Sequence, residues 1–209
     1  MTSLSSRAQR LLSAGTIAAL ALLTSACASF YVDPVLPKVE PQEIAKPAWV
    51  PTPVQLLVEF KTNGAANAGA TQQVRPMVVE AVSRTGLFSE VSAEPVDGGR
   101  VLSVSINNVA NMSDAAAKGF LTGLTLGAAG NMVTDGYVCE MNFTEPGAPS
   151  RTATVKHAMH TQLGAGQVPP ALKPVPSAIE GVKQIVDQMV LTGLKQRTDP
   201  AAPTKPAVR

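Results

Sequence analysis

Residues 137–163 read YVCEMNFTEPGAPSRTATVKHAMHTQL, and this stretch predicts the hairpin on which the fold depends. From Tyr137 to Phe143 the odd-numbered residues are apolar and two of the three even-numbered ones are polar, which is typical of a strand with one buried face. Residues 145–147 (Glu-Pro-Gly) supply a turn. Residues 151–163 are therefore expected to return as the antiparallel partner strand.

Outward from this hairpin, the chain alternates between further strands and helices. Alternating apolar residues predict strands over 54–61 and 102–107, and apolar residues at helical spacing predict a helix over 71–84, with Pro76 making its first turns irregular. A capping box, Ser177 followed by Glu180, begins a last helix with a continuous apolar stripe. The order predicts an α+β fold: a two-layer sandwich of a mainly antiparallel sheet with two helices on one face, plus a Gly-rich apolar insert.

The first residues have the organisation of an export signal. Arg7 and Arg10 precede an apolar run over residues 11–23, and the small residues Thr-Ser-Ala lead to Cys27. The stretch Leu-Leu-Thr-Ser-Ala-Cys resembles a bacterial lipobox, although a threonine stands three places before the cysteine. Residues 1–26 are thus predicted to be a lipoprotein signal peptide and Cys27 the lipidated residue. The alternative is an ordinary secretory signal that is cut near Ala26, with Cys27 incidental.

The predicted mature chain has three parts. Six prolines between residues 34 and 53 predict that 27–53 form an extended tether behind the lipid. Residues 54–198 are long enough for a single domain with its own core. Residues 199–209 are again rich in proline and are expected to be a disordered tail.

Charge argues against nucleic acid as a partner. Without Arg7 and Arg10, the 17 basic residues become 15 and balance the 15 acidic ones. A neutral chain gives no electrostatic footprint for a phosphate backbone.

Cys139, His157 and His160 are the residues that could carry chemistry. Strand alternation places Cys139 on the buried face, where a free cysteine is a small hydrophobic residue. On a strand, a spacing of three puts His157 and His160 on opposite faces, with His157 near the edge of the core and His160 in solvent. No complete zinc ligand set or catalytic motif is evident, so we expect no metal, no cofactor and no enzymatic activity.

The segment Gly119–Val133 is uncharged and has glycine at every fourth position from 119 to 127. One interpretation is a lid or helix packed tightly on its own domain. The other is an exposed apolar surface, formed by Phe120, Leu121, Leu124 and Leu126, that contacts a partner or a membrane. At about 24 Å as a helix, the uncharged stretch is too short to span a bilayer.

In its architecture the chain resembles small bacterial envelope lipoproteins of the YajG type and the auxiliary lipoproteins of ABC transport systems. The matching features are the lipobox at Cys27, the proline-rich stretch, the corner at residues 85–91, the hairpin from Tyr137 and the capped last helix. The resemblance implies a non-catalytic accessory protein that contacts envelope machinery. Because Ala28 and not aspartate follows the cysteine, it also implies the periplasmic face of the outer membrane. The alternative function is a carrier of a small apolar ligand or lipid beneath the segment Gly119–Val133.

Overall fold

The computed structural model describes residues 28–46, 51–110 and 132–198. Within them, the strands are β1 (Ala28–Val32), β2 (Val54–Thr62), β3 (Ala65–Ala66), β4 (Val91–Ser92), β5 (Val101–Val109), β6 (Met132–Thr144), β7 (Arg151–Leu163) and β8 (Lys173–Val175). The helices are α2 (Ala68–Ser83), α4 (Ala178–Thr198) and a short 3-10 turn, η2 (Pro41–Glu43).

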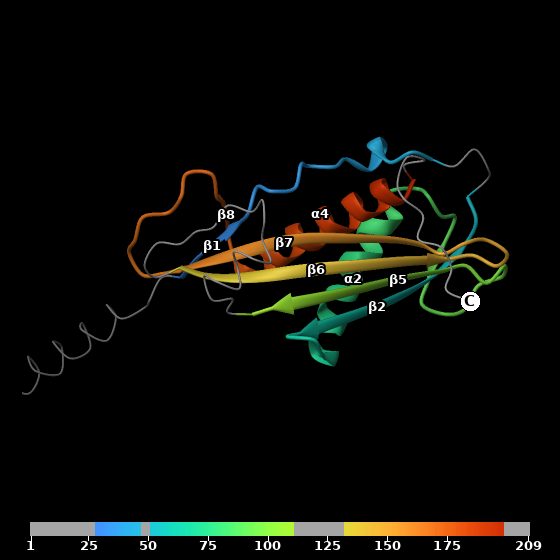
Figure 1. Cartoon of the computed structure of the whole chain (residues 1–209), viewed down its shortest axis with the longest axis horizontal. Helices are drawn as coiled ribbons and strands as arrows, with labels where there is room; N and C mark the ends of the chain where they lie inside the picture. The colour runs from blue at the N-terminus through green and yellow to red at the C-terminus, as the bar shows by residue number, and fades with distance from the viewer. Residues whose placement is uncertain (1–27, 47–50, 111–131, 199–209) are drawn as a thin grey trace, which may run out of the picture.

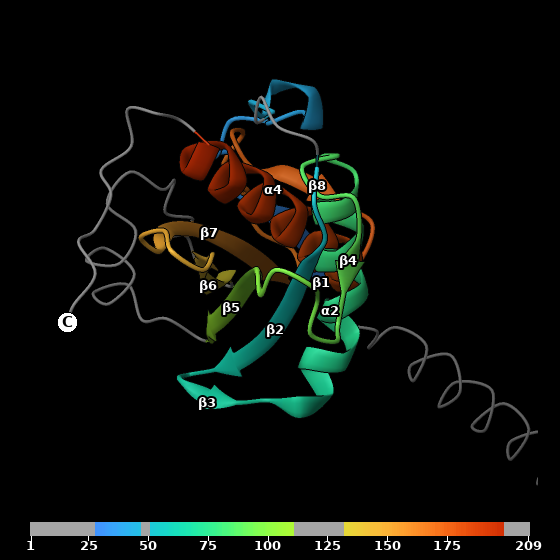
Figure 2. The ribbon, with the colours of Figure 1, turned by 90° about the vertical axis from the view of Figure 1, so that its right-hand side faces the viewer.

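All eight strands belong to one sheet in the order β3-β2-β5-β6-β7-β1-β8, with β4 pairing β2 (Figure 1). The β2–β5 and β2–β4 pairs are parallel, and the other pairs are antiparallel. Both α-helices pack against the same face of this sheet (Figure 2). The predicted α+β class is confirmed.

The predicted β6–β7 hairpin is confirmed, and it lies within the sheet between β5 and β1. Its register runs from Phe143 opposite Arg151 to Met132 opposite Gln162, so β6 begins five residues before Tyr137. Strand β2 ends at Thr62, one residue after the prediction, because Asn63 and Gly64 both have positive φ and turn the chain into β3.

Both helices contribute to a single core, α2 through one stripe and α4 through a stripe that widens to all of residues 189–194. Helix α2 begins at Ala68, three residues before the prediction, because the side chain of Asn67 accepts a hydrogen bond from the Ala70 N–H at 3.0 Å. Pro76 therefore lies inside a continuous helix and not in an irregular first turn. At α4, the Ser177 hydroxyl accepts from the Glu180 N–H at 3.3 Å, which is one of the two hydrogen bonds of the predicted capping box.

The tether predicted for residues 27–53 is wrong where the structure describes it. Strand β1 pairs with β7 from Ala28 opposite Leu163 to Val32 opposite Met159. Farther along, Val39 and Ile44 are buried in the core. The prolines break regular structure, but the apolar residues between them pack on the domain, which therefore includes described residues before Val54.

Several predicted features lie outside the described residues. These are the signal peptide 1–26, Cys27, the apolar residues Phe120, Leu121, Leu124 and Leu126, and the tail 199–209. Of the segment Gly119–Val133, only Met132 and Val133 are described, and both belong to β6. In the described part of the chain, no helix has the length and hydropathy needed to cross a bilayer.

Candidate functional site

Both histidines of β7 are fully buried, so the prediction that His160 faces solvent is wrong. The prediction assumed that only the helix side of the sheet is covered. From His157 to His160 all four residues of β7 are buried, because its last part is covered on both faces. Asp33 and the loop at Gly166 lie against the face away from the helices.

His160 joins three strands of the sheet through a buried polar network. Its Nε2 donates to Oδ2 of Asp33 at 3.3 Å, and its Nδ1 lies 2.9 Å from the Thr134 hydroxyl. The other oxygen of Asp33 accepts from the Val35 N–H at 2.9 Å. The network fixes the end of β1 to β6 and β7, and sequence reasoning identified neither Asp33 nor Thr134 as part of it.

His157 lies on the opposite face of β7, as its spacing from His160 predicts, but deep in the core and not at its edge. Its Nδ1 accepts from the Ala158 N–H at 2.8 Å, which leaves Nε2 to donate to the side-chain oxygen of Gln188 at 2.5 Å. Burial lowers the pKa of His157, against the opposing effect of the Gln188 hydrogen bond. The ring is therefore held as a neutral link between β7 and α4.

The buried His157 makes the stability of the fold sensitive to mild acid. Below about pH 6.5 an unfolded histidine binds a proton that the folded core disfavours, so the free energy of unfolding falls as the pH falls. The loss attributable to His157 between pH 7 and 5 is expected to be up to about 1.4 kcal/mol per pH unit. Urea unfolding of the wild type and His157→Gln at both pH values measures it. Equal pH dependence in the two proteins would contradict this origin.

Cys139 is fully buried on the helix face of β6, which confirms its prediction as a core residue. Burial, with a smaller effect of Glu140, raises the pKa of its thiol to about 12. A thiol in this state presents almost no thiolate, the form that attacks substrates and binds metals. Its register partner on β7 is Val155 and not a histidine.

The hydroxyl–imidazole–carboxylate network at His160 has the groups of a nucleophilic triad, but a substrate has no access to its hydroxyl. Asp33 and Thr134 are buried together with His160, so the hydroxyl is not presented to a substrate. Across the described ranges, no three His, Cys, Asp or Glu side chains group as metal ligands. The arrangement that the structure shows is one that holds strands together.

A shallow groove of about 340 Å³ runs between α2 and α4 on the outer side of the helix layer. Four of its five charged side chains are paired across the groove, Arg84 with Asp187 and Lys183 with Glu80 at 3.9 Å, and the fifth is Glu180. Because most of these charges compensate locally, the groove has no strong field that would select a charged ligand.

Comparison with known proteins gives only distant structural likenesses. No family model and no curated protein matches the chain. The rare lipoprotein B structure from Shewanella oneidensis matches at 12% identity over 66% of this chain and 86% of that one, with a TM-score of 0.33. A PelC dodecamer from Paraburkholderia phytofirmans matches at 13% identity over 72% and 91%, also with a TM-score of 0.33. Likenesses at this level carry no functional argument.

Proposed function

We propose that the chain is a lipid-anchored, non-catalytic accessory protein of the bacterial cell envelope. The observation that carries the proposal is the sequence at residues 7–27: a basic start, an apolar run, small residues and then Cys27. Acyl chains on that cysteine would hold the protein to a membrane, because each buried methylene contributes about 0.8 kcal/mol of binding free energy.

The described polar residues support a non-catalytic role. Cys139 has a raised thiol pKa in the core, and His157 and His160 have both ring nitrogens occupied by hydrogen-bond partners. None of these three groups is free to exchange a proton with a substrate. We further propose, from the lipoprotein resemblance, that the protein acts by contacting envelope machinery at the periplasmic face of the outer membrane.

Lipidation of Cys27 has two measurable consequences. In the wild type, mass spectrometry of the amino-terminal peptide is expected to find acyl chains on Cys27. Cys27→Ala is expected to carry no acyl mass and, once its leader is removed, to move from the membrane to the soluble fraction.

Cys139→Ala is the matched control, because it removes the other of the two cysteines of the chain. It should keep both the acyl mass and the membrane location. An unmodified amino terminus at or beyond Cys27 in the wild type would overturn the proposed function.

A further inference from the structure

Cys27 is followed directly by the first residue of a paired strand, so no linker separates a lipid on Cys27 from the domain. Ala28 is already paired with Leu163, and the pairing continues for the five residues of β1. Consecutive Cα atoms are about 3.8 Å apart, so a lipid on Cys27 would lie one residue from the paired strand. Whatever surface surrounds the start of β1 must then lie at the membrane.

That surface, the anchor corner, consists of β1 and residues 161–179, which form the end of β7, the following loop, β8 and the start of α4. Between Thr161 and Ile179 the only formally charged residue is Lys173, and β1 has none. Within the anchor corner, contact with a bilayer therefore requires the desolvation of a single charge, and that charge is of the sign that anionic lipids attract. The exposed Glu180 follows directly after Ile179 and marks the edge of this weakly charged surface.

The anchor corner also holds two of the three large apolar side chains that are exposed in the described ranges. Leu163 is 46% exposed and Ile179 is 51% exposed. Gly181 of α4 packs on Met159, whereas Gly193 packs near Val155, so α4 runs back along β7 and its first turn lies beside the end of that strand. Ile179 and Leu163 are thereby brought to the same end of the molecule.

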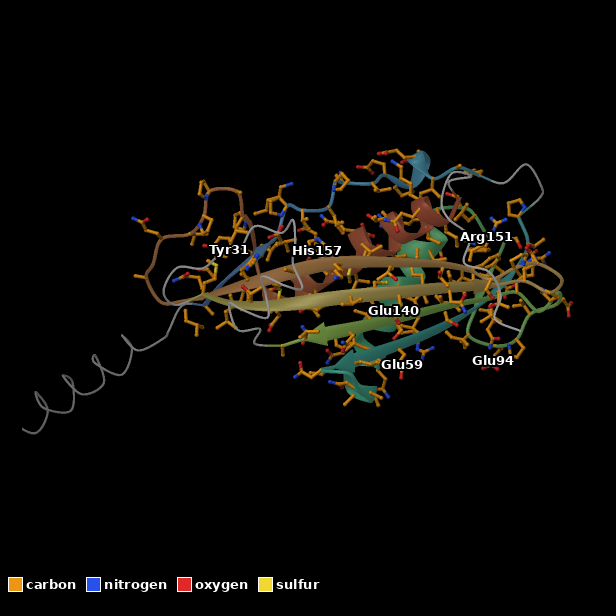
Figure 3. All side chains as sticks on the ribbon, viewed as in Figure 1. Tyr31, Glu59, Glu94, Glu140, Arg151 and His157 are labelled. Carbon is orange, nitrogen blue, oxygen red and sulfur yellow. The ribbon has the colours of Figure 1, made fainter. Side chains whose placement is uncertain are left out.

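The opposite end of the sheet has a different surface. Glu94 lies there in the loop before β5 and Arg151 at the start of β7, and Figure 3 shows both far from Tyr31 of β1. Arg100 and Glu145 form an ion pair at 2.7 Å in the same region. The charged end is suited to water, and the nearly uncharged end is the one next to Cys27.

We propose that the anchor corner rests on the lipid bilayer, with Leu163 and Ile179 entering its interfacial region. The proposal builds on the lipidation of Cys27 proposed above. In this arrangement the domain is not separated from the membrane by an extended tether. It is held in one orientation, with its charged end pointing away from the membrane.

The test uses the full lipidated protein, purified from membranes and placed in phosphatidylcholine–phosphatidylglycerol vesicles. Leu163→Cys and Ile179→Cys are each labelled with an environment-sensitive fluorescent maleimide; Cys139 is buried and does not compete. Leu57→Cys is the matched control, because Leu57 is 44% exposed but lies on β2, away from the anchor corner. Thermal melting of each variant verifies that the fold is kept.

Labels at 163 and 179 are expected to shift to the blue in vesicles and to lose emission when the lipids carry a nitroxide, whereas the label at 57 does neither. If labels at 163 and 179 stay as insensitive as the label at 57, in a sample whose mass shows acylated Cys27, the orientation is wrong and the anchoring stands. A sample without acyl mass overturns the proposed function, and the orientation with it.

Discussion

Asp33→Ala is expected to reduce the free energy of unfolding by about 3 kcal/mol. Asp33 is 1% exposed, and its two oxygens accept from Val35 N–H and His160 Nε2. Alanine leaves the buried His160 Nε2–H and the part-buried Val35 N–H without this acceptor, and an unsatisfied buried donor costs about 1–3 kcal/mol. Urea unfolding followed by circular dichroism measures the loss, and hydrogen exchange should show β1 opening first.

Asp97→Ala serves as the control, since Asp97 is an exposed aspartate in the loop before β5 and its loss should change stability by less than about 0.5 kcal/mol. Asp33→Asn keeps one side-chain oxygen and should fall between the two. An Asp33→Ala protein as stable as Asp97→Ala would show that the network does not hold β1.

If Cys27 is the anchor, Asp33 helps the domain to withstand force that is applied through the lipid. Any pull on a lipid at Cys27 passes into β1, and the Asp33–His160 contact lies at the inner end of that short strand. Five residues of strand pairing alone would fray readily at a chain end. The buried network at the junction of β1 with the core prevents this fraying from extending into the domain.

Sequence patterns predicted the parts of the fold in which one face is buried and the other exposed. The strands β2 and β5 alternate cleanly, and the first part of β7 does so up to Lys156. Helix α4 shows its cap in the sequence and, up to Val186, its apolar stripe, whereas residues 189–194 are all buried. Where one face is covered and the other is exposed, the residues that are buried recur with the period of the strand or helix.

The pattern failed where burial does not alternate. From His157 to His160 both faces of β7 are covered. The alternation of apolar and polar residues therefore no longer indicates which face of the sheet a side chain is on. The prediction of a tether around Val39 was wrong for another reason. The prolines there indicate extended chain, but extended chain can also pack on a domain. The partners Asp33 and Thr134 come from distant segments, which no local pattern connects with His160.

Gly193→Val is expected to reduce the free energy of unfolding by about 2 kcal/mol. A Cβ atom on Gly193 would overlap Sδ of Met141 and lie 3.6 Å from Cγ2 of Val155, so α4 can approach the sheet this closely only with glycine. Met141 is 2% exposed and has little room to yield. Gly69→Val is the control in α2, because a Cβ there meets only Asn67 at 3.7 Å, and valine should change stability by a few tenths of a kcal/mol.

A double-mutant cycle separates crowding at Gly193 from other effects of the valine. Met141→Ala alone should destabilise the fold, because it leaves a cavity beneath α4. Combined with Gly193→Val, it removes the overlapping atoms, so the loss in the double variant should be smaller than the sum of the two single losses. Additive losses would mean that α4 and β6 are not in the tight contact that Gly193 permits, and the packing of the helix layer on the hairpin would need another explanation.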